Sequence, residues 1–268
     1  MNNRWIAISD THGDHLDADA WVFVRQFIDD FQPDTRIHLG DVFDLRFLRS
    51  GCTDQERYED VSADIEAGMN LIDEYKPTHL LFGNHDHRLV RAQKDGSGVV
   101  RQFCRDLHET IMKQLRAHGT SVYPYCSRRG VLHWNGMAML HGYAHGQYAG
   151  RQHAQVYGDC LFGHVHRIDA GTAARLVDGV SVQATGRAVG CLCRLDMDYA
   201  SHRLATLQWQ HGFAFGTVDK GKVTVCQASR DPVTGQWSLP YFERPERSKP
   251  ATKPSTRKTT KQNGSRRG

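Results

Sequence analysis

Residues 4–12 read Arg-Trp-Ile-Ala-Ile-Ser-Asp-Thr-His, and this stretch decides the fold. The apolar run predicts a buried strand, and the polar residues directly after it predict a loop at the carboxyl end of that strand. In open α/β sheets, ligands bind outside the carboxyl ends of the strands. The stretch therefore predicts an α/β sheet with a polar site at the edge where this strand ends.

The residues that follow alternate between helix and strand patterns. Apolar residues at helical spacing predict helices over 17–31 and 56–75, and short apolar runs predict strands over 35–39 and 78–82. Pro33 and Pro77 separate each helix from the strand after it. This alternation predicts neighbouring strands connected by right-handed crossovers.

The second half of the chain has a different pattern. After a helix predicted over 99–117, one further helix is predicted over 147–157, among short strands at 121–125, 131–134, 137–140, 160–162, 180–184, 191–196, 204–210 and 223–227. We therefore expect an α/β fold with two facing mixed sheets and outer helices, a four-layer α/β/β/α sandwich.

The charge distribution divides the chain at residue 243. Residues 244–268 contain nine Lys/Arg and one acidic residue, a net charge of +8, whereas residues 1–243 have a net charge of −4. The basic segment has almost no large apolar residue and cannot bury enough surface to order itself. We predict one catalytic domain over 1–243 and a disordered basic tail over 244–268.

Composition also bears on the compartment. No run of about 18 apolar residues is present, which argues against a membrane span. The first residues lack the apolar region of a secretory signal. Seven scattered cysteines predict free thiols that act as small core residues in a reducing compartment. We expect a cytoplasmic protein that has no contact with a membrane and no obligate protein partner.

Five polar clusters follow apolar runs, at 9–12, 40–44, 83–86, 141–142 and 163–166. They contain carboxylate, imidazole and amide groups, which suit Mn, Fe, Zn or Mg. Each cluster alone is ordinary turn or strand-end chemistry. As a set of five, all at strand ends, they predict one shared metal site.

In order, the clusters read Asp-x-His, Gly-Asp-x-x-Asp, Gly-Asn-His-Asp, His and Gly-His-x-His. This order resembles the signature of the calcineurin-like metallophosphoesterase superfamily, over about the first three-fifths of the chain. The resemblance implies two divalent metals, most readily Mn, that share Asp41 and a bridging hydroxide, which attacks the phosphorus of a phosphate ester. By the same resemblance, one metal is bound by Asp10, His12, Asp41 and His166, and the other by Asp41, Asn84, His141 and His164. His145 is a second candidate for the fourth cluster, but His141 directly follows the strand and is preferred.

The resemblance also implies roles around the metals. His85 would stand beside the leaving group as general acid or electrostatic stabiliser, and Asp86 would orient His85 and favour its imidazolium form. Asp44 would either hold a metal-bound histidine in place or cap a loop. Arg46 and Arg49 would either bind phosphate or be solvated loop charges.

The substrate class follows from details of the same clusters. Protein Ser/Thr phosphatases have Glu where this chain has Asp86, and they have an Arg-Gly after the second cluster that is missing here. The sequence more closely resembles the Mre11/SbcD type of nuclease domain, which implies a phosphodiesterase or nuclease acting on DNA or RNA. The alternatives are a phosphomonoesterase, a nucleotide or sugar pyrophosphatase, or a non-catalytic metal-binding scaffold. The tail would either bind nucleic acid or only improve solubility.

Overall fold

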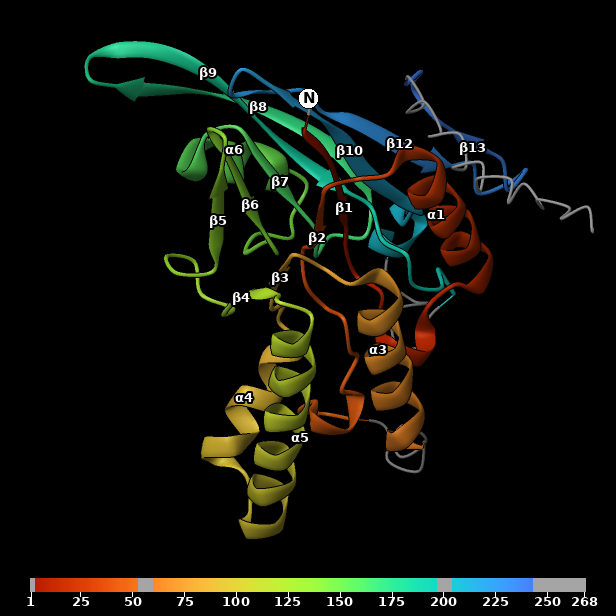
Figure 1. Cartoon of the computed structure of the whole chain (residues 1–268). Coiled ribbons are helices and arrows are strands. Elements are labelled where there is room, and N and C mark those ends of the chain that lie inside the picture. The colour runs from red at the N-terminus through yellow and green to blue at the C-terminus, as the bar shows by residue number, and fades with distance from the viewer. Residues whose placement is uncertain (1–2, 53–59, 197–203, 243–268) are drawn as a thin grey trace, which may run out of the picture.

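The structure, a computed structural model, describes residues 3–52, 60–196 and 204–242, whose strands form two sheets (Figure 1). The first sheet has the order β13 (Trp237–Ser238), β12 (Cys226–Arg230), β10 (Gly212–Asp219), β1 (Asn3–Ile8), β2 (Thr35–His38), β3 (His79–Leu81) and β4 (Ser121–Tyr123), and β11 (Lys222–Val223) pairs with β10. The second has the order β5 (Val131–Trp134), β6 (Met137–Leu140), β7 (Cys160–Phe162), β9 (Val180–Val189) and β8 (Ile168–Val177). Both sheets are mixed: β1, β2, β3 and β4 are parallel, as are β6, β7 and β9, and the remaining pairs are antiparallel.

Helices cover the outer faces of both sheets. The described helices are α1 (Ala18–Phe31), α3 (Val61–Tyr75), α4 (Asp86–Asp95), α5 (Gly98–Ala117) and α6 (Ala149–Tyr157), with short 3-10 turns η1 (Gly13–His15), η2 (Arg46–Leu48) and η4 (Leu204–Gln208). Asp17 accepts a hydrogen bond from the backbone N–H of Ala20 and so begins α1. In Figure 1, α1 and α3 flank the first sheet, α6 lies on the second, and α4 and α5 form a pair that extends away from both.

Alternation along β1 explains how the layers are held together. Trp5 and Ala7 contribute to an apolar cluster that includes Met139 and Leu161 of the second sheet, so these side chains lie between the sheets. Ile6 and Ile8 belong to the cluster formed with the outer helices. Successive side chains of a strand point to opposite faces, so one strand contributes to two layers of core. The predicted four-layer sandwich is confirmed.

Several predicted elements differ from the structure. Residues 191–196 make only two isolated bridges, and 204–208 form η4 rather than a strand. The helix α4 and the strands β8 and β10 have no counterpart in the sequence prediction. Strand β10 pairs with β1, so the chain returns to the first sheet after building the second. The predicted tail at 244–268 lies outside the described residues.

The helices and the cysteines complete the description of the fold. None of the described helices combines the length and apolar character that a membrane span requires. All seven cysteines are free thiols, as predicted, and four of them are buried: Cys104, Cys160, Cys191 and Cys193.

Candidate metal centre

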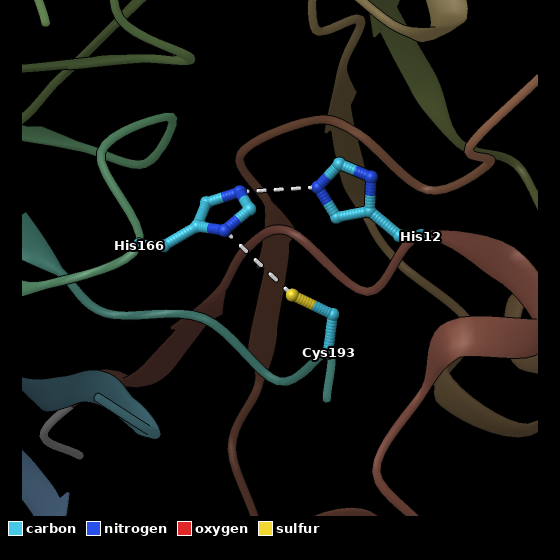
Figure 2. Close-up of side chains that lie close together, drawn as sticks. All are labelled: His12, His166 and Cys193. Carbon is cyan, nitrogen blue, oxygen red and sulfur yellow. Dashed lines mark hydrogen bonds between the residues drawn. The ribbon is translucent and has the colours of Figure 1, made fainter. Parts of the chain in front are cut away.

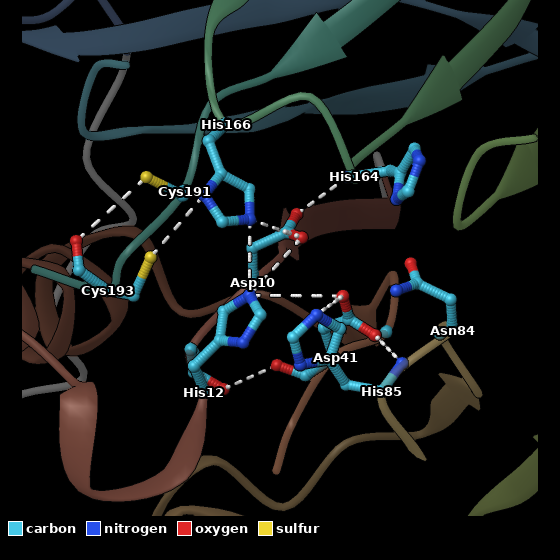
Figure 3. Close-up of polar contacts among 12 residues, drawn as sticks. Asp10, His12, Asp41, Asn84, His85, His164, His166, Cys191 and Cys193 are labelled. Atoms are coloured by element: carbon cyan, nitrogen blue, oxygen red, sulfur yellow. Dashed lines mark hydrogen bonds and ion pairs between the residues drawn. The ribbon is translucent and has the colours of Figure 1, made fainter. Parts of the chain in front are cut away.

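The loops after β1, β2, β3, β6 and β7 meet at one place, and Figure 3 shows labelled residues from the loops after β1, β2, β3 and β7 there. Many of the residues there have left-handed backbone conformations, which cost non-glycine residues about 1–3 kcal/mol each. Such strained positions cluster at functional sites. Five of the seven predicted ligands adopt this conformation: Asp10 (φ 54°), His12 (52°), Asp41 (55°), His164 (70°) and His166 (55°).

One cluster of ligand atoms lies beside β1. Ligand atoms of Asp10, His12 and Asp41 all lie within 4.8 Å of one another. His166 joins them, because its Nε2 is 3.2 Å from Asp10 Oδ1 and 3.1 Å from His12 Nε2. Asp10, His12 and Asp41 are almost completely buried.

A second cluster lies beside β6 and shares Asp41 with the first. Ligand atoms of Asp41, His141 and His164 lie within 4.8 Å of one another. His141 Nε2 is 3.3 Å from Asp41 Oδ2 and 3.0 Å from the side-chain oxygen of Asn84. The structure thus brings all seven predicted ligands together, with Asp41 between the two groups. It places His141 in this cluster, whereas His145 is exposed.

The hydrogen bonds of His141 show what the second cluster is suited to bind. Its Nδ1 lies 2.9 Å from the backbone oxygen of Leu39, and a carbonyl oxygen can only accept, so Nδ1 carries the hydrogen. The lone pair of a neutral His141 then faces two oxygens, from Asp41 and Asn84. That arrangement is repulsive unless a proton or a cation lies between them.

In the first cluster, too, a histidine lone pair faces another ligand atom. His12 Nδ1 lies 3.1 Å from Asp44 Oδ1, which accepts, so the His12 lone pair at Nε2 faces His166 Nε2. His166 has Cys193 Sγ at its other nitrogen, 3.8 Å from Nδ1 (Figure 2). Asp10 Oδ1 is buried and accepts no hydrogen bond from the described part of the chain. Both clusters therefore fit a divalent cation held by oxygen and imidazole ligands.

The pKa shifts agree with this interpretation. Burial lowers the pKa of His141, but the neighbouring carboxylates, Asp41 first and then Asp10 and Asp86, together outweigh burial and raise it to about 9. Burial raises the pKa of Asp41, but the neighbouring imidazoles of His141, His85 and His12 together outweigh burial and lower it. A proton on Nε2 of His141 therefore lies where a cation could bind between this ring and the oxygens of Asp41 and Asn84.

Asp44, not Asp86, lies against His85. His85 Nδ1 is 2.8 Å from Asp44 Oδ1, and Asp44 also contacts His12, so Asp44 holds two histidines in place. Burial lowers the pKa of His85, and Arg88 Nη2 donates to its Nε2 at 3.1 Å, so the ring is neutral. The predictions that Asp86 orients His85 and favours its imidazolium form are therefore wrong.

Asp86 instead supports the loops that carry the ligands. Its carboxylate accepts hydrogen bonds from the backbone N–H groups of Gly83 and Asp41 at 2.8 Å and of Phe43 at 3.1 Å. As the first residue of α4, it lies where the ends of β2 and β3 converge. It positions the backbone of Asp41.

Two supporting residues were not predicted. Asp64 on α3 accepts from the backbone N–H groups of Asp44 and Leu45 at 2.9 and 2.6 Å, and burial raises its pKa to about 6. His38 accepts from the N–H of Gly40, and burial lowers its pKa to about 3. No sequence motif marks Asp64 or His38, and their contacts become visible only in the structure.

Cys193 also has a more specific place than the predicted core role. Its thiol lies at Nδ1 of His166, on the side of the ring away from Asp10 (Figure 2). Burial raises the pKa of this thiol well above its usual value, so it remains protonated. It contacts a ligand without belonging to the oxygen and imidazole set.

The two arginines after the second cluster differ from each other. Arg46 makes a two-point ion pair with Asp14, at 2.7 and 2.6 Å, and is buried. It is therefore neither a solvated loop charge nor available for phosphate in this arrangement. Arg49 lines a cavity together with Arg88 and Arg91.

Comparisons with known proteins give a family. The family model for calcineurin-like phosphoesterases matches residues 4–167. No curated protein sequence matches the chain. Among solved structures, a metallophosphoesterase from Sphaerobacter thermophilus is 14% identical, with 84% of this chain and 87% of that chain covered and a TM-score of 0.45. An archaeal phosphodiesterase is also 14% identical (83% and 98% covered, TM-score 0.37), and zinc-bound Vps29 from Entamoeba histolytica is 11% identical (88% and 97%, TM-score 0.44).

Proposed function

This chain belongs to the calcineurin-like phosphoesterase family, and we propose that it is an enzyme that hydrolyses phosphodiesters at the candidate metal centre. The observation that carries the proposal is the position of Asp41, whose carboxylate lies between two groups of ligand atoms. Paired divalent cations supply Lewis acidity and lower the pKa of water. The proposed ligand set of oxygen and imidazole donors suits Mn, Fe, Zn or Mg, and Mn²⁺ is the cation that we propose to test first.

The surrounding residues have distinct parts in this proposal. Asp44 and Leu39 hold His12 and His141 in the tautomers that direct Nε2 toward the centre. The guanidinium of Arg88 lies 3.1 Å from the imidazole of His85, and His85 Nε2 lies 4.0 Å from Asp41 Oδ2. The guanidinium of Arg88 is placed to stabilise negative charge that develops on phosphoryl oxygens or on the leaving oxygen, and the neutral His85 accepts its hydrogen bond and holds it there.

Nucleic acid is the substrate class that we propose. The support is the charge of residues 244–268, a net of +8, whereas residues 1–243 have a net charge of −4, because basic segments bind phosphate backbones through counterion release. Such binding does not depend on the base sequence of the nucleic acid. It would fall with rising salt concentration and with removal of the segment.

The experiment compares bis-p-nitrophenyl phosphate with p-nitrophenyl phosphate in the presence of Mn²⁺. We expect the diester to be hydrolysed with the higher kcat/KM, and we expect Asp41→Asn to abolish turnover. Asp29→Asn on the exposed side of α1 is the control and should retain it. Preference for the monoester would indicate a phosphomonoesterase, and a folded, metal-loaded protein inert on both esters would indicate a scaffold.

His85→Ala gives a second test of the same site. Removing the imidazole should lower kcat by about 10²-fold or more while the metal content is unchanged, because His85 is not among the ligands. Unchanged kcat in this variant would remove His85 from the mechanism.

A further inference from the structure

A cavity of about 460 Å³ lies next to the metal centre, between η2 and the pair α4–α5. Its walls include Arg49 after η2 and Arg88 and Arg91 on α4. Binding pockets for small molecules commonly have volumes of about 300–1,000 Å³, so the cavity can hold a group as large as a nucleotide.

The cavity and the metal centre share one side chain. Arg88 lines the cavity, and its Nη2 lies 3.1 Å from His85 Nε2. Its Nη1 donates to the backbone oxygen of Asp44 at 2.8 Å, which holds the guanidinium in place. A ligand in the cavity would therefore contact a residue that touches the candidate catalytic histidine.

The charge of the cavity wall selects an anion. Of the described residues that line the cavity, three are arginines and one, Asp95, is acidic, and the assignment rests on the guanidiniums of Arg88 and Arg91 on α4. Arg88 and Arg91 are three residues apart on α4 and so lie on the same side of the helix. Guanidinium groups match phosphate oxygens with two parallel hydrogen bonds, which makes phosphate the anion expected here.

The remaining wall is mostly apolar, with Ser50 as its polar side chain. Phe47 and Val100 line the cavity, and the ring of Phe47 lies 6.1 Å from that of Phe103. A wall that combines aromatic and aliphatic groups with arginines suits a nucleotide, because its base can pack on apolar groups while its phosphate meets the guanidiniums.

We propose that this cavity binds a second phosphate group of the substrate, one ester unit away from the phosphodiester that is cleaved. The proposal rests on the proposed function and narrows its substrate to phosphodiesters that carry another phosphate. That phosphate can be the next backbone unit of a nucleic acid or a terminal phosphate of a short oligonucleotide.

The test uses the dinucleotide TpT, its 5′-phosphorylated form pTpT and its 3′-phosphorylated form TpTp. For the wild-type protein with Mn²⁺, we expect at least one phosphorylated form to have a KM about tenfold below that of TpT. In Arg91→Gln this ratio of KM values should fall toward one. The exposed Arg105→Gln on α5 lies outside the cavity wall and should keep the wild-type ratio.

Equilibrium binding distinguishes failure of this proposal from failure of the proposed function. The affinities of TpT, pTpT and TpTp are measured calorimetrically with EDTA present, so that no hydrolysis is needed. A preference for a phosphorylated form that disappears in Arg91→Gln supports the cavity assignment even if no ester is cleaved. Arg49→Gln should give the same result if Arg91→Gln does not fold.

Two results would overturn the proposal. One is equal KM and equal affinity for all three dinucleotides in the wild-type protein. The other is a preference for a phosphorylated form that both Arg91→Gln and Arg49→Gln retain. If a longer oligonucleotide has a lower KM than pTpT and TpTp, the second phosphate comes from the nucleic-acid backbone rather than from a terminal phosphate.

Discussion

Seven side chains from five loops converge on the candidate metal centre, and Asp41 lies between the two groups that they form. Each of the five clusters follows an apolar run, so its place at a strand end can be inferred from the order of residues alone. The supporting carboxylates could not be assigned in this way. Asp44 comes three residues after Asp41 and Asp86 two after Asn84, but these spacings do not show which side chains the two carboxylates contact. A side-chain direction of this kind is set by tertiary structure.

Protonation of a single residue, His141, should make metal affinity depend on pH. His141, with a pKa of about 9 in the metal-free protein, must lose a proton before its Nε2 can bind a cation. The proton is present below that pKa and lost above it, so affinity rises with pH. We expect the apparent Kd for Mn²⁺ to fall by up to about tenfold per pH unit between pH 6 and 9 for each proton displaced. Calorimetric titration would measure this trend, and a Kd that does not change over that range would contradict it.

Elements with a clear apolar pattern were predicted within a few residues of their bounds. The strands β5, β6 and β7 match their predicted ranges, since each is a short apolar run between turn residues. The helix α4 was missed because Leu89 is its one buried apolar residue, so it shows almost no apolar periodicity. Residues 204–208 resemble a strand in composition but form η4, because strand preference in a short segment depends strongly on its context.

The loop after β7 packs closely against the loop after β1 that carries Asp10. A Cβ at Gly163 would overlap Ser9 Oγ and come within 2.5 Å of Asp10 Oδ2. We expect Gly163→Ala to displace Asp10 and to lower the number of bound Mn²⁺ ions, measured by equilibrium dialysis. Gly98→Ala is the matched control, because a Cβ there meets no other atom within 4 Å. Equal metal content in the two variants would show that this close approach does not matter.

At the scale of the whole molecule, the packing of the two sheets against each other fixes the relative positions of the ligand loops. Loops from the first sheet carry Asp10, Asp41 and Asn84, and loops from the second carry His141 and His164. The sequence predicted facing sheets, but it contained no indication that β10 returns to pair with β1. That pairing joins segments about 210 residues apart, and no local pattern encodes it.

The apolar layer between the sheets should dominate stability. Leu161 is fully buried there, so Leu161→Ala should lower the free energy of unfolding by about 2–5 kcal/mol through lost burial and a residual cavity. Leu176→Ala on the β8–β9 hairpin removes the same atoms from a side chain that is 77% exposed. It should change the free energy of unfolding by less than about 0.5 kcal/mol. Chemical denaturation measures both, and equal losses would contradict the layered core.

The number of Mn²⁺ ions bound per folded chain tests the account most directly. Equilibrium dialysis followed by elemental analysis should find two ions in the wild-type protein, and fewer in Asp41→Asn because both clusters share that carboxylate. A wild-type protein with native circular dichroism that binds no ions, or binds two that Asp41→Asn retains with unchanged affinity, would contradict the account.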